Sequence, residues 1–477
     1  MGRLRFFGVL GGTKDTTIQK YRYSIIGLGK LGASIAAAIS GRGHDVVGVD
    51  SNHDIVDLIN AGQAPVHETG LAELIAANRD RLRATTSYQE AILETDITFV
   101  VVPTPSNELG GFSLDHVQLA FREIGAALEK KDAYHLVGLT STVLPGSTRH
   151  DLLPILEQKS RKVCGPDFGL CYSPSLVALG SAIRDFLFPD FTLIGEFDER
   201  SGSMLEAAYA EILPQRPECR RMTLENAELA KISINTYVTM KITYANILAD
   251  LCERIPGGDI DVVTAAIGLD TRIGGKYLIG ALGYGGPCFP RDNLAFDHMA
   301  RSLGTQAELA ETADRINRLL PETVMERLGV AITPGSTIAV LGLAYKPSSY
   351  ITEGSQGLLL ANELSRRGAR VIAHDPLADK FAASDLGDEA IVLESLSECL
   401  KQASIVVVAT PDPAYAELEP KDFAVSKQPV TVVDCWRILS DKLVNQTNIV
   451  YLPIGRSVND AVNSARLVAL RNSCVDQ

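Results

Sequence analysis

Short apolar runs alternate with segments of helical spacing through the first part of the chain. The first run, Tyr23–Ile26, is followed by an alanine-rich stretch at 33–40 and by a second apolar run that ends at Asp50. Later runs of the same kind lie at 97–105 and 133–142. Alternating strands and helices are typical of a parallel sheet whose strands are joined by crossover helices. The sequence therefore predicts an open α/β sheet here.

A long stretch from Thr223 to Arg254 changes to helical spacing of its apolar residues. A helix of this length would extend roughly 45 Å, enough to connect two domains and to offer a dimer surface. Lys231 and Asn235 are spaced four residues apart, so they share one face of this helix. A solvated lysine and a neutral asparagine are also ordinary on a helix, and the spacing alone leaves their roles open.

A second alternating region begins near Thr337. It contains a strand and turn at 338–346, a helix at 357–367 and a strand at 370–374. Further strands are expected at 404–410 and 429–434. The unit of the first region is therefore expected to repeat, with Lys346 at a strand end where a phosphate or sugar could bind.

The turn after Tyr23–Ile26 carries three glycines. Gly27 suits a tight turn, Gly29 would admit a pyrophosphate to the following helix N-terminus, and Gly32 would let that helix pack on the strand. Asp50 would bind the adenosine ribose hydroxyls, and no basic residue directly follows it to hold a 2′-phosphate. The complete unit predicts NAD rather than NADP. The second region lacks this glycine triplet, so a second NAD is not expected there.

These patterns predict an α/β protein with two Rossmann-like doubly wound domains, joined by a long central helix and a helical dimerisation region. The expected division is a flexible N-terminal extension at 1–21, the first Rossmann domain at 22–215, the central region at 216–325 and the second Rossmann-like domain at 335–470.

Charge and cysteine spacing narrow the class of protein. The 477 residues carry a formal net charge of −13, which argues against nucleic acid or an anionic membrane as the main partner. No apolar run approaches the ~20 residues of a membrane span. The eight cysteines show no paired CxxC or CxxH spacing, so neither a zinc site nor a disulfide framework is expected. A reducing cytoplasm fits this usage.

The segment Gly283–Asp292 is the most informative one chemically. Its glycines let the backbone pass close to a ligand, and Pro290 suits a first helical turn, so Cys288 would sit just outside a helix N-terminus. The helix end and Arg291 would both favour the thiolate, the form that attacks carbonyl carbons. Asp292 is within reach as a proton acceptor. A structural cysteine after a glycine turn fits the same segment, and spacing alone does not decide between the two.

In combination, these motifs resemble the nucleotide-sugar 6-dehydrogenases, the family of UDP-glucose, GDP-mannose and UDP-N-acetylmannosamine dehydrogenases. The resemblance covers about residues 22–460 and rests on segments 27–32, 102–105, 141–148, 227–235, 268–274, 283–292 and 342–346. It implies that the first domain holds NAD, that the second holds the nucleotide, and that the long helix forms a homodimer with the active site between domains. The segment at 180–190 looks more like the UDP-glucose branch than the N-acetylhexosamine branch.

The resemblance also implies roles for individual residues. Catalysis is expected from Cys288, Lys231, Asn235, Asp292 and Thr142. Contacts with NAD are expected from Gly27, Leu28, Gly29, Lys30, Leu31, Gly32, Asp50, Thr104, Thr142 and Arg291. Contacts with the nucleotide sugar are expected from Lys231, Asn235, Arg272, Tyr277, Gly285 and Lys346, with Arg272 reaching across the dimer interface. No metal is implied.

The implied chemistry is a four-electron oxidation of the sugar C6 hydroxyl that uses two NAD. Cys288 would attack the aldehyde formed first, and the resulting thiohemiacetal would be oxidised to a thioester that water opens to a carboxylate. Lys231 would stabilise the oxyanions at C6, and Asn235 would donate a hydrogen bond to the same region. Asp292, with water, is the expected base for the alcohol proton.

Four places depart from the family pattern. Ser175 and Leu179 stand where glutamates are usual, Glu353 replaces an arginine that reaches NAD, and the stretch at 435–437 lacks the usual Arg-Asn pair. Arg437 could supply that cation from a shifted position. Losing a general base typically costs ~10²- to 10⁴-fold in rate.

Two alternatives therefore stay open: oxidation that stops at the aldehyde, and a non-oxidative paralogue that binds NAD and a nucleotide sugar.

Overall fold

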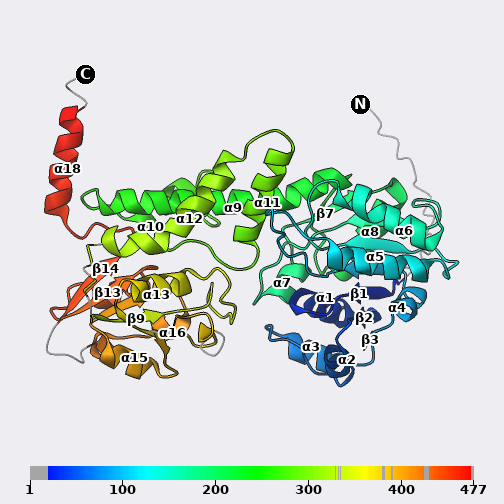
Figure 1. Ribbon diagram of the computed structural model, residues 1–477, viewed down its shortest axis with the longest axis horizontal. Helices are drawn as coiled ribbons and strands as arrows, with labels where there is room; N and C mark the ends of the chain where they lie inside the picture. Colours follow the sequence, from blue (N-terminus) through cyan, green and yellow to red (C-terminus); the bar gives the residue numbers. More distant parts are fainter. Residues whose placement is uncertain are drawn as a thin grey trace, which may run out of the picture.

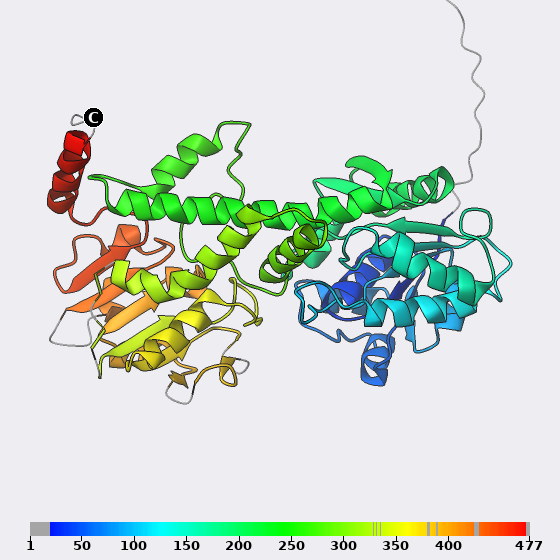
Figure 2. The same cartoon turned by 45° about the horizontal axis from the view of Figure 1, so that its top comes forward.

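Two α/β domains lie beneath one long helix that runs across both of them (Figures 1 and 2). The computed structural model describes residues 20–473, with gaps at 328, 331, 334, 379–381, 388–389 and 424–428. The expected extension at 1–21 lies outside the described residues except for Lys20 and Tyr21. Within the described part, no helix combines the length and apolar content that crossing a membrane requires.

The N-terminal domain is built on an eight-stranded sheet in the order β3-β2-β1-β4-β5-β6-β7-β8. The strands are β1 (Tyr23–Ile26), β2 (Val46–Val49), β3 (Leu82–Thr85), β4 (Ile97–Val100), β5 (Leu136–Leu139), β6 (Gly169–Tyr172), β7 (Phe191–Glu196) and β8 (Glu218–Thr223). Adjacent strands are parallel except for β6 and β7, which pair antiparallel. The predicted parallel sheet is confirmed. Its order reverses between β1 and β4, the place where open α/β sheets bind ligands.

Helices cover both faces of this sheet, and each face has its own apolar core. One face is covered by α1 (Lys30–Gly41), α2 (His53–Asn60), α3 (Leu71–Ala77), α7 (Ala182–Leu187) and α8 (Glu199–Ile212), and the other by α4 (Tyr88–Glu94), α5 (Asp115–Leu128) and α6 (Leu153–Ser160). Strands β1, β2, β4 and β5 are buried at every residue. Burial on both faces explains why they read as unbroken apolar runs in the sequence.

Helix α9 (Leu224–Glu253) confirms the long helix predicted from apolar spacing, within one residue at each end. Thr223 caps its N-terminus by accepting a backbone amide hydrogen bond. One turn later, the fully buried Glu228 carboxylate accepts hydrogen bonds from the amides of Gly146 and Thr148 at 2.6 and 2.9 Å. These bonds fix the first part of α9 against the π-helical segment Ser147–Leu152 of the N-terminal domain.

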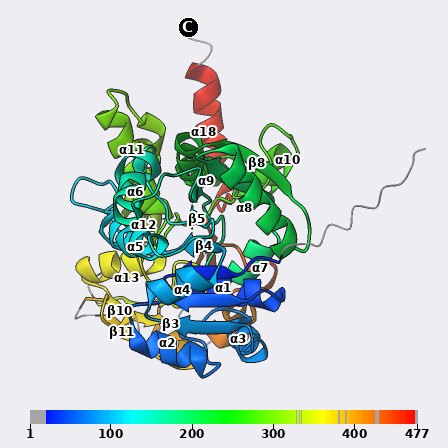
Figure 3. The same cartoon turned by 90° about the vertical axis from the view of Figure 1, so that its right-hand side faces the viewer.

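Three further helices pack along α9: α10 (Ile260–Gly268), α11 (Phe289–Ser302) and α12 (Glu308–Arg327). The end-on view shows α11 and α12 on one side of α9 (Figure 3), and the three helices contact one another. The last helix, α18 (Asp460–Ser473), extends away from the body of the protein (Figure 1). The central region therefore lies where it can supply side chains to a site between the domains.

The C-terminal domain repeats the unit of the first domain, as predicted. Its six strands follow the order β11-β10-β9-β12-β13-β14, and each neighbouring pair is parallel. The strands are β9 (Thr337–Leu341), β10 (Arg370–His374), β11 (Ala390–Val392), β12 (Ile405–Val408), β13 (Val430–Asp434) and β14 (Ile449–Pro453). Helices α13 (Gln356–Arg366), α15 (Leu396–Gln402), α16 (Pro413–Ala416) and α17 (Ser440–Leu443) accompany this sheet. The Asp375 carboxylate after β10 accepts hydrogen bonds from the amides of Leu343 and Ala344 at 2.7 and 2.9 Å.

Arg437 does not supply a cation to the ligand site, so this expectation is wrong. Its guanidinium donates to both carboxylate oxygens of Asp261 at 2.8 Å. The remaining nitrogen donates to the carbonyls of Gly280 and Ile454 at 2.8 and 2.9 Å. Because every guanidinium nitrogen is engaged and the side chain is only 2% exposed, Arg437 connects the C-terminal domain to α10 instead.

Candidate active site

The glycine turn between β1 and α1 has the geometry of a dinucleotide site. Gly27 has a φ of +91°, and a Cβ there would lie 3.0 Å from the Val101 carbonyl oxygen. A Cβ at Gly32 would lie only 1.8 Å from the Gly27 carbonyl oxygen, so the helix packs directly on the turn. A Cβ at Gly29 would meet nothing within 4 Å. The open space therefore lies at the helix N-terminus, where a pyrophosphate fits.

Asp50 is held beside this turn. Its Oδ2 accepts a hydrogen bond from the Leu28 amide at 2.8 Å, and its Oδ1 accepts one from the Asn52 amide at 2.9 Å. Each carboxylate oxygen keeps acceptor capacity for a ribose hydroxyl. The Leu28 side chain is fully buried and Leu31 packs against the core, so these two residues offer the ligand only main-chain atoms.

Thr104 and Thr142, from loops after β4 and β5, come together as the sheet order predicts. The Thr104 hydroxyl donates to the Thr142 carbonyl at 2.8 Å. The Arg291 side chain of α11 donates to the Thr104 carbonyl at 3.3 Å and lies 5.0 Å from the ring centre of Phe112. Arg291 thereby connects the central region to the N-terminal domain.

Asp292 has no exposed surface and is held from two sides. The Asn235 amide donates to its Oδ2 at 2.6 Å, and Arg291 donates to its Oδ1 at 3.0 and 3.1 Å. The structure thus brings together three residues predicted for the site. Asn235 bonds to Asp292 in this arrangement, which gives it a positioning role toward that carboxylate.

Lys231 lies one helical turn before Asn235 on α9, and only 8% of its surface is exposed. Its ammonium makes no hydrogen bond or ion pair with any residue in the described part of the chain, although its charge acts on the Cys288 thiol. A lysine held in this way retains its donors for an oxyanion.

Cys288 occupies the N-cap position of α11 without a side-chain capping bond, and Pro290 lies in the first turn, as predicted. Among the cysteines that the structure describes, Cys288 alone is exposed. Desolvation by the surrounding protein raises the pKa of the Cys288 thiol above its usual value. Arg291 and Lys231 counteract this rise, whereas Asp292 and Glu353 add to it. The expectation of an easily ionised thiol is therefore wrong.

Arg272 and Tyr277, both predicted to contact the nucleotide sugar, lie at the edge of the cluster around Cys288. Arg272 is 86% exposed and pairs with Asp270 at 2.6 Å. Tyr277 has a φ of +63°, and its ring packs edge-on against Phe289, beside Cys288, with 6.3 Å between ring centres. In the described part of the chain, the Arg272 side chain bonds to Asp270 and not to Cys288.

Gly285 and Lys346, the other two residues predicted to contact the nucleotide sugar, lie where the C-terminal domain meets the central region and the N-terminal domain. A Cβ at Gly285 would approach the Gly354 carbonyl oxygen to 2.3 Å, so no side chain fits there. Lys346 is half-buried beside Gly180 of the N-terminal domain. Burial lowers the pKa of Lys346, while the Glu68 carboxylate acts in the opposite direction.

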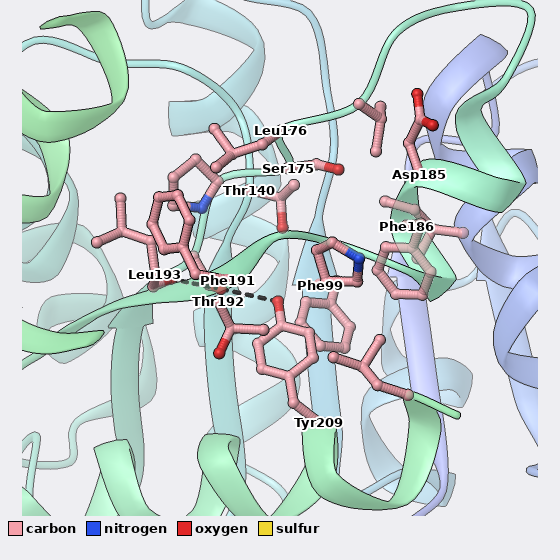
Figure 4. A pocket seen from close by; sticks show the side chains of 16 residues that line it. Phe99, Thr140, Ser175, Leu176, Asp185, Phe186, Phe191, Thr192, Leu193 and Tyr209 are labelled. Atoms are coloured by element: carbon pink, nitrogen blue, oxygen red, sulfur yellow. Dashed lines mark hydrogen bonds between the residues drawn. The ribbon is translucent and has the colours of Figure 1, made fainter. Parts of the chain in front are cut away.

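Ser175 lines a largely apolar pocket behind the ends of β6 and β7 (Figure 4). Rings from Phe99, Phe186, Phe191 and Tyr209 line its wall. The one acidic residue in its lining, Asp185, already accepts hydrogen bonds from Ser181 and Ala178. Ser175 therefore lacks the carboxylate of the usual glutamate, and no free carboxylate among the residues that line this pocket takes its place.

Three domain models of one family match the chain in order. They are the NAD binding domain at 21–213, the central domain at 225–319 and the UDP binding domain at 339–441. The chain belongs to the UDP-glucose/GDP-mannose dehydrogenase family. It is therefore an NAD-dependent nucleotide-sugar dehydrogenase, as the resemblance implied.

Relatives of this dehydrogenase cover nearly the whole chain. It is 37% identical to the UDP-glucose 6-dehydrogenase AglM of Haloferax volcanii, over 87% of this chain and 97% of that one. It is 33% identical to the GDP-mannose 6-dehydrogenase of Azotobacter vinelandii, over 86% and 96%. The structure of a UDP-glucose dehydrogenase from Pyrobaculum islandicum matches with a TM-score of 0.82 and 33% identity, over 94% and 100%.

Glu68 is a residue of the dehydrogenase that sequence reasoning missed. Its buried carboxylate accepts hydrogen bonds from the amides of Gly180 and Ala182 at 2.7 and 3.1 Å. These bonds hold the loop that carries Leu179 and the start of α7. The partners lie 112 and 114 residues away in the chain, so no local pattern marks Glu68.

Tyr350 was missed as well. Its ring lies 4.9 Å from the Lys30 ammonium, beside the glycine turn, and 6.3 Å from the His67 ring. Lys30, His67, Leu179 and Tyr350 line a second pocket where the two Rossmann domains meet. Lys30, predicted to contact NAD, thus also contacts the C-terminal domain.

Gly29 and Gly32 offer a matched test of the NAD site. We expect Gly29→Ala to leave the melting temperature unchanged but to weaken NAD binding at least ~10-fold, about 1.4 kcal/mol, because the new methyl occupies the space for the pyrophosphate. Gly32→Ala must displace backbone and should cost about 1–3 kcal/mol of stability. Thermal unfolding and calorimetric NAD titration measure both effects. Native NAD affinity in Gly29→Ala would contradict this assignment.

The raised pKa of Cys288 predicts a shifted alkylation profile. A thiol whose pKa is raised stays protonated at neutral pH, so iodoacetamide should label Cys288 slowly at pH 7 and faster as the pH rises, with a midpoint above that of free cysteine. Lys231→Met removes a charge that lowers this pKa and should move the midpoint higher still. Peptide mass spectrometry of residue 288 follows the reaction, with Cys288→Ala as the blank. A midpoint below that of free cysteine would refute the assignment.

Proposed function

We propose that this dehydrogenase oxidises the C6 hydroxyl of a nucleotide sugar, UDP-glucose by preference, to the carboxylate through a thioester on Cys288. The observation that carries the proposal is the arrangement at the start of α11. There the exposed Cys288 thiol lies within the electrostatic reach of Lys231, Arg291 and Asp292. A structural cysteine needs neither exposure nor charged neighbours on both helices.

The side chains divide the chemistry between them. Cys288 attacks the C6 aldehyde, and the Lys231 ammonium stabilises the oxyanion of the thiohemiacetal because its donors are not used elsewhere in the described chain. Asp292 accepts the alcohol proton through water. Asn235 positions Asp292. NAD, when bound, accepts the hydride in each of the two oxidations.

The cofactor residues fit this scheme on structural grounds. The open space at Gly29, the remaining acceptor capacity of Asp50 and the paired threonines at 104 and 142 all lie at the carboxyl ends of β1, β2, β4 and β5. That edge is the one at which a dinucleotide binds. Arg291 is tied to Thr104 and lies between this edge and Asp292.

Ser175 favours one alternative, an oxidation that stops before release of the acid. The one acidic residue that lines the pocket of Ser175, Asp185, is already engaged by Ser181 and Ala178. Thioester hydrolysis is the step that such a loss would slow, because water is a weak nucleophile without a base.

The stoichiometry of NADH separates these outcomes. With purified protein under anaerobic conditions, UDP-glucose should yield two NADH per sugar and a free carboxylate, and GDP-mannose and UDP-N-acetylmannosamine should react more slowly. Cys288→Ala should lose the second NADH because no thiohemiacetal can form. Absorbance at the NADH band and mass spectrometry of the sugar product measure both. Two NADH per sugar from Cys288→Ala would refute the covalent route.

We also propose that the chain forms a homodimer through α9. Tyr237, Tyr244 and Leu251 recur every seven residues and are 54%, 53% and 48% exposed, with Ile247 beside them at 43%. Such a stripe of exposed apolar side chains marks a protein interface. Arg272, which is exposed in one chain, would then be free to reach the partner's sugar site.

Charging this stripe should break the dimer. Tyr244→Glu places a carboxylate in the middle of the proposed interface, where its desolvation is costly, and should shift the protein to a monomer in sedimentation velocity. Leu109→Glu serves as the control, because Leu109 is 76% exposed on a loop of the N-terminal domain. A native sedimentation coefficient for Tyr244→Glu would exclude this surface.

A further inference from the structure

Glu353 lies on the segment of the C-terminal domain that covers the cysteine turn. Its carbonyl oxygen accepts a hydrogen bond from the Gly286 amide at 2.8 Å, two residues before Cys288. The next carbonyl, that of Gly354, packs against Gly285 so closely that no side chain fits between them. Position 353 is therefore fixed against the backbone that leads into Cys288.

The segment is also anchored on its other side. Thr352 donates to the Asp385 carboxylate at 2.9 Å, and Ser355 caps α13 by accepting the Leu358 amide. The Glu353 side chain itself is exposed and makes no hydrogen bond or ion pair with the described residues. The backbone of Glu353 is thus fixed, and its carboxylate remains available to accept a proton.

Two carboxylates act on the Cys288 thiol among the described residues, Asp292 and Glu353. The first is fully enclosed, and both of its oxygens accept hydrogen bonds from Asn235 or Arg291. The Glu353 carboxylate is exposed and makes no hydrogen bond or ion pair with the described residues. Ser175 offers no carboxylate from the N-terminal domain.

We propose that Glu353 is the catalytic base for hydrolysis of the Cys288 thioester. A water oxygen forms a bond to the acyl carbon as its proton passes to the Glu353 carboxylate. The carbon–sulfur bond then breaks with its electron pair on Sγ, and the proton returns from Glu353 to the sulfur. The sum is thioester plus water giving carboxylic acid plus thiol, with no oxidant required. This inference rests on the proposed function.

Glu353→Gln tests the step, because it keeps the size of the side chain and removes the base. We expect it to form two NADH per active site in a rapid burst and then to turn over about 10²- to 10⁴-fold more slowly than the native chain. Intact-protein mass spectrometry should show the sugar nucleotide acyl group on Cys288, and hydroxylamine should release it as a hydroxamate. Glu353→Asp should recover part of the rate.

Glu394→Gln is the matched control, since Glu394 is another exposed glutamate of the same domain without a described partner; it should turn over as the native chain does. Native turnover of Glu353→Gln with no acyl-protein would overturn the role of Glu353 while leaving the proposed function intact. Failure of the native chain to form NADH with any of the three sugars would instead overturn the proposed function, and this inference with it.

Discussion

A carboxylate wholly removed from water holds the candidate active site together. Burying such a charge costs several kcal/mol unless it is paired and hydrogen-bonded, so Asp292 requires both Asn235 and Arg291 in place. Asn235 belongs to α9, whereas Arg291 also bonds to Thr104 of the N-terminal domain. The buried Asp292 carboxylate therefore aligns α11 with the long helix and with the cofactor domain. Cys288, at the start of the same helix, takes its place from this alignment.

The two Rossmann domains share a tight turn but differ in the length of chain between the turn and its helix. Gly32 packs on the Gly27 carbonyl, where a Cβ would come within 1.8 Å, and Gly357 packs on the Gly342 carbonyl, where it would come within 2.0 Å. The same tight turn and close helix contact thus occur twice. In the second domain, segment 343–356 separates Gly342 from Gly357. This segment carries Tyr350, which contacts Lys30 of the N-terminal domain, and Glu353, whose charge acts on the Cys288 thiol. The longer connection places Glu353 and Gly354 against Gly285 and Gly286, the turn that leads into Cys288.

Features set by neighbouring residues could be predicted from the sequence. The glycine turn, α9 and the N-cap position of Cys288 each depend on positions a few residues apart. Contacts between distant residues could not: Arg437 binds Asp261 176 residues away, and nothing near either residue indicates the pair. The direction of the Cys288 pKa was missed for the same reason, because the local helix end and Arg291 favour ionisation whereas desolvation comes from packing of the whole site.

The state of Cys288 also affects how the resting protein withstands oxidants. Peroxides attack the thiolate, so a thiol held in its protonated form is a poor target even when it is open to solvent. Cys164, Cys171, Cys399 and Cys435 are protected differently, by burial. Cys288 can therefore remain accessible without becoming the weak point of the protein under oxidative stress.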